Sequence, residues 1–182
     1  MSPSIARDSM DDAARRPGCT VRRVRRDEAR ALATIRLAAL RDSPSAFGSS
    51  FEAESCRTPD EWTARALAGA AGVDRVTFFA LVHDEVVGLV GGFRPDGDGR
   101  FVELVSMWAS PECRRAGVGR ALVGAVIDWA RDVSAGTVML WVTVGNVPAL
   151  RLYESMGFRQ TGEVKPLPSD LSREEARMTL EL

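Results

Sequence analysis

The chain has 182 residues, of which 45% are hydrophobic and 27% charged, a composition that suits one globular domain with a sizeable core. Its 24 basic and 25 acidic residues leave a formal net charge of −1, so an overall basic surface for nucleic acid is excluded. One histidine and three widely spaced cysteines argue against a metal site or a disulfide framework. No apolar run approaches the roughly 18 residues that span a membrane, and no apolar signal segment is evident at the N-terminus, so we expect a cytoplasmic protein.

The first elements in chain order are a strand and two helices. Residues 1–18 mix charges with Ser and Pro, and we expect a disordered tail ahead of one domain over 19–182. Alternation over Cys19–Arg25 predicts a strand, and the spacing of apolar residues then predicts a helix from Asp27 to about Arg41. The Ser-rich segment 42–56 predicts a loop with a short helical turn. Thr58-Pro59 begins a second helix that ends near Ala68.

The remaining elements alternate between strands and helices. The sequence predicts, in order, strands at Val76–His83, Val86–Phe93 and Phe101–Ala109, a helix from Val118 to about Val133, a strand at Thr137–Val144, a helix from Asn146 through Met156, and strands at Phe158–Glu163 and Ala176–Leu182. Asp84-Glu85 forms the first hairpin connection, RPDGDGR forms a second turn, and residues 165–175 are expected to be a loop. The order β-α-α-β-β-β-α-β-α-β-β predicts a single α/β domain with a mixed sheet.

The segment Arg114–Arg120, RRAGVGR, joins a predicted strand to a predicted helix. A helix N-terminus offers free backbone N–H groups and partial positive charge, and glycine lets an anion approach the backbone. A Walker A loop needs Lys-Ser/Thr after the last glycine, but Arg120-Ala121 follows here. A Rossmann fingerprint needs a third small residue where Leu122 stands. The segment therefore predicts an anion site of another kind.

The spacing of Arg114, Gly117 and Gly119 resembles the Arg/Gln-x-x-Gly-x-Gly/Ala pattern of the GNAT superfamily of acyl-CoA-dependent N-acetyltransferases. The later segment NVPALRLYESMGF, which begins at Asn146, is similar to a second segment of that family. The predicted element order also resembles the family fold from about Val21 to Leu182. The resemblance implies a single-domain GNAT-like fold with a splayed pair of strands in its central sheet, and acetyl-CoA as cofactor.

The resemblance also implies roles for individual residues. The pyrophosphate of coenzyme A would lie on the turn made by Arg114, Arg115, Ala116, Gly117, Val118, Gly119 and Arg120. The edge of Met107-Trp108-Ala109 would pair with the pantetheine arm, which enters where a bulge splays this strand from Thr137–Val144. Asn146 would cap the following helix and contact the arm, and Tyr153 would lie near the thioester sulfur.

Acetyl transfer to an amine makes three chemical demands. An alkylamine has a pKa of about 10.4 and must lose a proton, for which Glu103 is the candidate base. The developing oxyanion needs a donor, for which the backbone N–H of Met107 or Trp108 is suited. The thiolate leaves best when protonated, and Tyr153 can supply that proton. Non-catalytic alternatives stay open. Glu103 could be a solvated carboxylate or an ion-pair partner of Arg100, and Tyr153 could be a core residue.

The acceptor is expected to be the primary amine of a small molecule. Phe47, Glu103, Trp108 and Trp141 are candidate substrate residues, although the core is the favoured place for Trp141. Acids in the segments 42–56 and 165–175 favour a cationic amine, such as a polyamine or an aminoglycoside-type antibiotic. Two alternatives remain, a protein N-terminal, lysine or aminoacyl-tRNA acetyltransferase and a non-catalytic CoA-binding sensor. Neither a nucleic-acid nor a membrane partner is expected, and dimers are common in proteins of this type.

Overall fold

The computed structural model describes residues 18–95 and 99–182. The expected tail therefore lies outside the described residues apart from Gly18, and the turn after Phe93 is described only in part. Within the described ranges, no helix is both long and apolar enough to cross a membrane.

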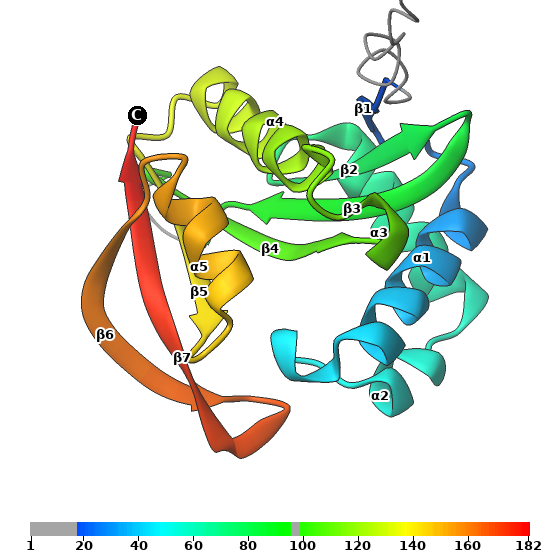
Figure 1. Ribbon diagram of the computed structural model, residues 1–182. Helices are drawn as coiled ribbons and strands as arrows, with labels where there is room; N and C mark the ends of the chain where they lie inside the picture. The colour runs from blue at the N-terminus through cyan, green and yellow to red at the C-terminus, as the bar shows by residue number, and fades with distance from the viewer. Residues whose placement is uncertain (1–17, 96–98) are drawn as a thin grey trace, which may run out of the picture.

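A seven-stranded mixed sheet runs through the molecule in the order β1-β2-β3-β4-β5-β7-β6 (Figure 1). The only parallel pair in the described sheet joins β4 to β5, and the other pairs are antiparallel. The strands are β1 Thr20–Arg23, β2 Arg75–Val82, β3 Glu85–Phe93, β4 Phe101–Ala109, β5 Thr137–Thr143, β6 Arg159–Leu167 and β7 Asp170–Glu181.

Helices cover the sheet unequally. They are α1 Ala29–Asp42, α2 Phe51–Ser55, α3 Pro59–Ala71, α4 Val118–Asp132 and α5 Val147–Glu154, with short 3-10 turns at Pro44–Ala46 and Pro111–Cys113. The α1 and α3 helices pack on one face of the strands β1–β4, while α4 and α5 lie on the opposite face (Figure 1). No helix among the described residues packs on the α1 side of β5, β7 and β6. The α1 side of that half of the sheet is therefore open.

Each face of the sheet has its own core. The core under α4 is built on Val102, Leu122, Val126, Leu140 and Met178, which are all fully buried or nearly so. The core under α1 and α3 is formed by other residues, which include Ile35, Leu40, Trp62, Phe79 and Trp108. Because successive strand residues point to opposite faces, one strand supplies side chains to both cores.

Most predicted elements are confirmed, including the short helical turn in 42–56, and two local predictions are wrong. Segment 165–175 is not a loop, because β6 and β7 continue through it as a hairpin that turns at Pro168-Ser169. Pro166 is tolerated in β6 because β6 is an edge strand, where a missing N–H costs no ladder bond. The β2–β3 turn is His83-Asp84 rather than Asp84-Glu85; both turn residues have positive φ, +49° and +65°, as a type I′ turn requires. The segment 42–56 contains the helix α2, which Ser50 caps.

A bulge in β4 divides this strand into two parts. The pairing of β3 with β4 shifts register between Leu89 and Gly91, and Ser106 takes φ +58° there. The pairing of β4 with β5 covers only Phe101–Glu103 against Thr137–Met139, and no pairs follow beyond it. The two central strands therefore separate beyond Glu103, which is the splayed pair that the family resemblance implied.

Candidate active site

The turn before α4 forms an open cradle at the N-terminus of the helix. Gly117 is the N-cap with φ +88°, and no side chain caps the helix. The first amide to bond within the helix is that of Ala121, which donates to the Gly117 carbonyl at 3.0 Å. A Cβ placed on Gly117 would meet no atom within 4 Å, so space lies open above the first turn. Free N–H groups, the helix dipole and open space together suit a phosphate group.

The arginines of the turn have different environments. The Arg114 guanidinium pairs with the Asp42 carboxylate, and its Nε donates to the Ala109 carbonyl at 3.1 Å. Arg120 donates to the Ser155 hydroxyl at 2.8 Å and so joins α4 to α5. Arg115 is exposed, has φ +62° and has no side-chain partner among the described residues. Of the three, Arg115 is therefore the one free to bind a phosphate without breaking an existing contact.

The bulge determines which backbone groups of β4 face the gap between the strands. The carbonyl of Trp108 lies toward Gly88 of β3, and the amide of Ser110 donates to Val87 of the same strand at 2.8 Å. Peptide groups alternate in direction along a strand, so Met107 and Ala109 direct their backbone groups toward the gap. Of the two donors considered for the oxyanion, the N–H of Met107 has the required direction and that of Trp108 does not.

The bulge also reverses the side-chain alternation of β4. Val102 and Leu104 belong to the core under α4, and Met107 packs against the same core. Glu103 and Trp108 point to the opposite face. The Met107 side chain therefore does not lie on the same face as Glu103, because the extra residue at Ser106 turns it to the other face.

Trp108 is a core residue of the α1 side. Its side chain is 7% exposed, and its indole N–H donates to the Asp42 carboxylate at 2.8 Å. Phe47 is also buried, beneath the Arg36 guanidinium at 4.7 Å from the ring centre. These two aromatic residues stabilise the packing of α1 on the sheet, and the structure does not place them as walls of an open substrate pocket.

Trp141, unlike Trp108 and Phe47, lies outside the core. The core was its favoured place, but its side chain is half-buried on the open face of β5 and belongs to neither core. The Lys165 ammonium of β6 lies 3.9 Å from its ring centre. Trp141 points outward because it is in register with Met139 and Thr143, whereas Leu140 and Val142 fill the core.

Tyr153 lies in the core under α4 and α5, beside the gap. Its side chain is 5% exposed, and its ring meets Phe158 edge-on at 5.7 Å. Burial raises the pKa of the phenol above its ordinary value of 10.0. Within the described part of the chain its hydroxyl has no hydrogen-bond partner. Tyr153 therefore offers a protonated hydroxyl with an unused donor.

Asn146 caps α5 as predicted. Its Oδ1 accepts from the Ala149 amide at 3.3 Å, and Pro148 follows at a position where a missing N–H is harmless. The cap fixes where α5 begins and so fixes the place of Tyr153 two turns later. The structure does not test the expected contact between Asn146 and the cofactor.

Glu103 lies among charged residues of the open face. Burial raises the pKa of the Glu103 carboxyl; the charges of Lys165 and Arg177 oppose this shift, while that of Glu175 adds to it. Lys165 pairs with Glu175 at 3.4 Å, and Arg177 pairs with Glu163 at 2.8 Å. Among the described residues Glu103 itself has no ion pair, so a proposed pairing with Arg100 is not observed among them.

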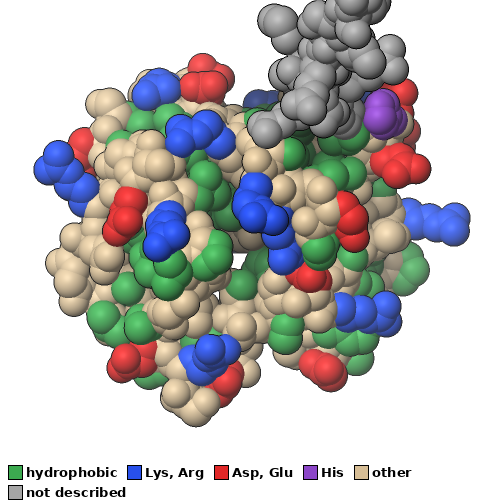
Figure 2. Space-filling model, viewed as in Figure 1, with side chains coloured by type: hydrophobic (Ala, Val, Ile, Leu, Met, Phe, Trp, Pro, Cys, Tyr) green, Lys and Arg blue, Asp and Glu red, His purple; other side chains and the backbone are tan. Residues whose placement is uncertain are grey.

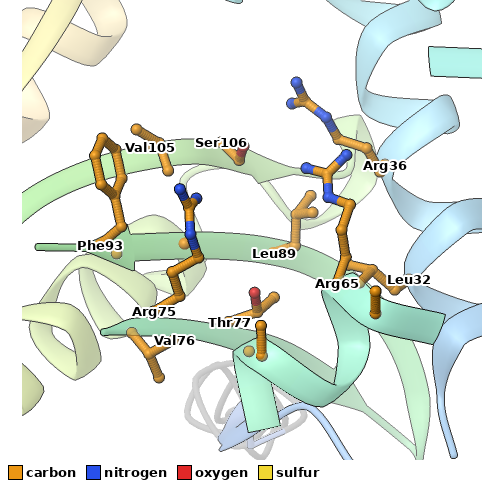
Figure 3. A pocket seen from close by; sticks show the side chains of 15 residues that line it. Leu32, Arg36, Arg65, Arg75, Val76, Thr77, Leu89, Phe93, Val105 and Ser106 are labelled. Carbon is orange, nitrogen blue, oxygen red and sulfur yellow. The ribbon is translucent and has the colours of Figure 1, made fainter. Parts of the chain in front are cut away.

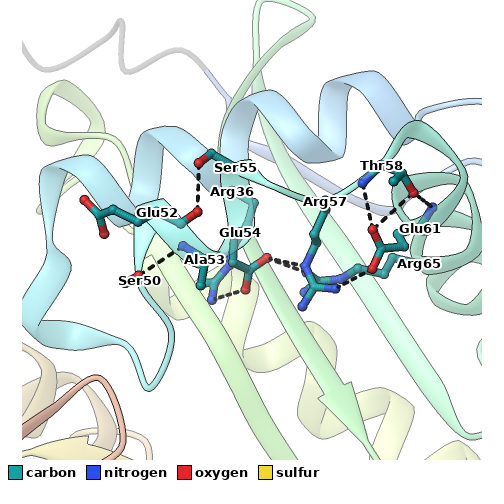
Figure 4. A network of polar contacts seen from close by, with 10 residues as sticks. All are labelled: Arg36, Ser50, Glu52, Ala53, Glu54, Ser55, Arg57, Thr58, Glu61 and Arg65. Atoms are coloured by element: carbon teal, nitrogen blue, oxygen red, sulfur yellow. Dashed lines mark hydrogen bonds and ion pairs between the residues drawn. The ribbon is translucent and has the colours of Figure 1, made fainter.

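One acid of segment 42–56 faces away from any acceptor, whereas Glu52 lines a surface cavity together with Asp170. Glu54 turns inward, is 3% exposed, and binds three arginines. Figure 4 shows this network, in which Arg36, Arg57 and Arg65 approach the Glu54 oxygens at 3.1, 3.3 and 2.5 Å. Arg57 also pairs with Glu61 at 3.7 Å, so the network contains two carboxylates and three guanidinium groups, an excess of one positive charge.

A cavity of about 290 Å³ lies beside this network, between the helices α1 and α3 and the strands β2, β3 and β4. Figure 3 shows Arg36 and Arg65 extending from the two helices on one side and Arg75 rising from β2 on the other. Val105 and Ser106 of the β4 bulge also line it. Sequence reasoning missed these arginines, although Arg36 stands four residues from both Leu32 and Leu40 on an otherwise apolar stripe of α1.

The surface is hollowed between the two halves of the molecule. Figure 2 shows an opening at the centre of the molecular surface in this view. The opening corresponds to the space where β4 and β5 diverge. The 3-10 turn Pro44–Ala46 bridges one end of this space, because Thr143 donates to the Ser45 carbonyl at 2.7 Å. Ser169 at the β6–β7 turn donates to the Phe47 carbonyl at 2.5 Å. Within the described ranges no group of three or more His, Cys, Asp or Glu residues could hold a metal ion.

Comparison with known families decides what this arrangement is. The model of the acetyltransferase (GNAT) family matches residues 35–158. The chain belongs to this family. The match includes the β4 bulge, the α4 cradle and the whole of α5, whereas the hairpin β6–β7 lies beyond it.

Solved GNAT structures have the same fold. The chain superimposes on the structure of yncA from Salmonella typhimurium, a putative acetyltransferase with its cofactor acetyl-CoA, with a TM-score of 0.75 and 21% identity over 91% of this chain and 94% of that one. N-acetyltransferase 8 of Homo sapiens is 35% identical over 84 residues, which are 44% of this chain and 37% of that protein. The N-acetylaspartate synthetase of Danio rerio is 35% identical over 86 residues, 47% and 30% respectively. The chain thus matches about a third of the length of these curated relatives.

The described residues fit acetyl-CoA, the cofactor of this GNAT domain. The α4 cradle, with Gly117 and the exposed Arg115, offers N–H groups, space and charge for a pyrophosphate. The edge of β4 at Met107 and Ala109 has no strand partner on the gap side and can pair with the amides of the pantetheine arm, although the Ala109 carbonyl already accepts from Arg114. Arg114 differs from the expectation, since it is held by Asp42 and Ala109 and acts within the scaffold of the turn.

Proposed function

We propose that the protein transfers the acetyl group of acetyl-CoA to the primary amine of a small molecule. One observation carries the proposal: the gap between β4 and β5 has Glu103 on one face of the sheet and Tyr153 on the other. An amine entering from the open face would meet a proton acceptor. A leaving sulfur on the opposite face would meet a proton donor.

The proposed roles follow from these positions. Acetyl-CoA supplies the acetyl group as an activated thioester. The N-terminus of α4 and Arg115 hold the phosphates, and the edge of Met107 and Ala109 holds the arm, with the Met107 N–H directed at the acyl oxygen. Glu103 takes the proton that the amine must lose, directly or through a water molecule, and its raised pKa improves it as a base.

Tyr153 is proposed as the donor to the leaving sulfur. The raised pKa of its phenol keeps it protonated at every working pH. A thiol has a pKa of about 8.5, so complete proton transfer from this phenol would be uphill. A hydrogen bond from the hydroxyl to the developing thiolate is therefore the form of assistance that its burial favours.

A small-molecule acceptor has additional support from the relatives. One of them is named as an N-acetylaspartate synthetase, and aspartate is a small molecule with a primary amine. The space between β4 and β5 is also closed at one end. The Ser45 carbonyl accepts from Thr143 of β5, and the Phe47 carbonyl accepts from Ser169 of the β6–β7 turn. A closed end suits a small acceptor better than a folded protein surface.

The test is release of coenzyme A thiol from acetyl-CoA over a panel of small amines, with mass detection of the acetylated product. Turnover of at least one amine, lost in Tyr153→Phe and Glu103→Gln together, is the expected result. Tight coenzyme A binding without turnover of any amine would instead favour the CoA-binding sensor. Turnover confined to peptides or aminoacyl-tRNA would favour the macromolecular alternative.

A further inference from the structure

The cavity between α1, α3 and the sheet is positively charged and lies next to the reaction gap. Arg36, Arg65 and Arg75 contribute to its walls, and no Asp or Glu of the described ranges does. The rest of the lining is mainly apolar or small, and includes Leu32, Leu89, Phe93 and Val105. A low-polarity wall strengthens each charge, because less water screens it.

Arg36 is the most informative of these residues. It is 5% exposed, and its Nη2 donates to Glu54 at 3.1 Å, but its Nε and Nη1 are buried without a partner in the described chain. Burial lowers the pKa of this guanidinium, Glu54 opposes the shift, and Arg65 and Arg57 add to it. A buried guanidinium normally has its donors satisfied, so these two N–H donors are available to an acceptor group of a ligand.

The other two arginines strengthen this conclusion. Glu54 is shared among Arg36, Arg57 and Arg65, and Glu61 pairs only with Arg57, so Arg36 and Arg65 have one carboxylate between them. Arg75 stands apart from that network; its guanidinium lies 5.0 Å from the Phe93 ring centre and has no carboxylate partner among the described residues. Figure 3 shows Arg75 beside Phe93 and Val105, facing the opening from the side opposite to Arg36.

The position of the cavity connects this charge to the reaction. Val105 and Ser106 form part of its wall, and Met107 follows directly at the edge of the gap. A molecule with its amine at the gap could therefore extend its other end into the cavity. A second ammonium group would be repelled there, whereas a carboxylate would be bound by planar guanidinium groups.

We propose that the acceptor is a small amine that also carries a carboxylate, and that the cavity lined by Arg36, Arg65 and Arg75 binds that carboxylate. The proposal rests on the proposed function for its amine end and replaces the expected cationic amine with an amino-acid-like acceptor. Arg75 and the free donors of Arg36 form the anion-binding groups, and Leu32, Leu89 and Val105 contact the carbon skeleton.

The kinetic test uses matched acceptors that differ only in the carboxylate. Phenylalanine, phenylalanine amide and phenethylamine form one set, and alanine, alanine amide and ethylamine a second. We expect the acids to be preferred in kcat/KM over their amide or decarboxylated counterparts by about ten-fold or more. Arg75→Gln should remove that preference by lowering kcat/KM for the acids to about the value of their amide or decarboxylated counterparts.

Arg57→Gln is the matched control, because Arg57 pairs with Glu54 but does not line the cavity. We expect it to retain the preference for acids. Equal kcat/KM for acids and their uncharged counterparts in wild type, or a preference that survives Arg75→Gln, would overturn the inference while the acetyltransferase function stands.

A binding measurement separates the two proposals. Titration calorimetry of the coenzyme A complex with 3-phenylpropionate and with 3-phenylpropanamide needs no turnover. Binding of the acid alone, weakened about ten-fold or more by Arg75→Gln, would support the anion site even if no amine were acetylated. Equal binding of acid and amide would count against the site whatever the activity. A thermal melt of each variant shows that it is folded.

Discussion

Asp42 at the C-terminal end of α1 accepts a hydrogen bond from the indole N–H of Trp108 on β4, at 2.8 Å. The same carboxylate oxygen pairs with Arg114, the first residue of the turn that leads into the α4 cradle. The side of the molecule that holds the proposed acceptor cavity is thereby attached to the strand and turn that hold the cofactor. One carboxylate sets the spacing between the two halves of the site.

We predict that Asp42→Asn lowers stability at neutral pH by about 0.5–1 kcal/mol, since Asn keeps an acceptor for Trp108 but loses the charge opposite Arg114. Burial raises the pKa of Asp42, but hydrogen bonds from Ser43, Trp108 and Arg114 outweigh it and hold the pKa below its usual value. The stabilisation is therefore complete above the ordinary Asp pKa of about 3.9 and is lost as pH falls through the lower folded-state value.

Thermal melts of wild type and Asp42→Asn between pH 3 and pH 7 check this prediction, with Asp128→Asn as control because Asp128 forms an exposed pair with Arg131. The difference in melting temperature between wild type and Asp42→Asn should become smaller as the pH falls from 7 to 3. A difference that is constant with pH would show that the charge of Asp42 contributes nothing.

Replacement of Tyr153 by Phe should lower kcat by about 100-fold without loss of folding. The hydroxyl has no partner in the described chain, so its removal breaks no hydrogen bond, and the ring contact with Phe158 is kept. The raised phenol pKa also predicts that wild-type kcat shows no basic limb from Tyr153 below a pH of about 10. Single-turnover kinetics and a thermal melt measure both effects; wild-type kcat in the variant would remove Tyr153 from the mechanism.

Replacement of Glu103 by Gln should abolish the acidic limb of kcat/KM. Burial raises the pKa of Glu103, so this limb should lie above the ordinary glutamate value of about 4.3. Because the folded-state pKa is raised, ionisation of Glu103 destabilises the fold as pH rises, and the Gln variant should melt no lower than wild type at pH 7. Glu52→Gln, an exposed acid of α2, serves as control. An unchanged pH profile would assign the limb to another group or to a water chain.

The two open glycines of the α4 region make a matched pair. Gly117 has φ +88°, so Gly117→Ala should cost roughly 1–2 kcal/mol of stability and weaken coenzyme A binding, because the new methyl group enters the cradle. Gly124 lies inside α4 with open space around its Cβ position, so Gly124→Ala should stabilise by about 0.5–1 kcal/mol and leave coenzyme A binding unchanged. Chemical unfolding and calorimetry with coenzyme A test both; equal affinities in the two variants would move the phosphate site away from Gly117.

The sequence by itself determined the fold class of this protein and the local elements proposed to bind its cofactor. These features depend only on residues that are neighbours in the sequence. They are the glycines at 117 and 119 before an apolar helix, the Asn146 cap before Pro148, and the alternation of side chains in the strands. The hairpin β6–β7 was missed because its polar and proline-containing strand is stable only as the edge partner of β7.

Only the tertiary structure decided the acceptor side. The direction of Met107, Trp108 and Trp141 depends on one extra residue at Ser106 and on which face each helix covers, and neither is a local property. The inward turn of Glu54 and the excess of arginine beside it join residues from α1, α2, α3 and β2 that are far apart in sequence. Charge counted along the chain therefore suggested an acidic rim, whereas charge placed in space forms a basic cavity, because burial and pairing determine which charges a ligand meets.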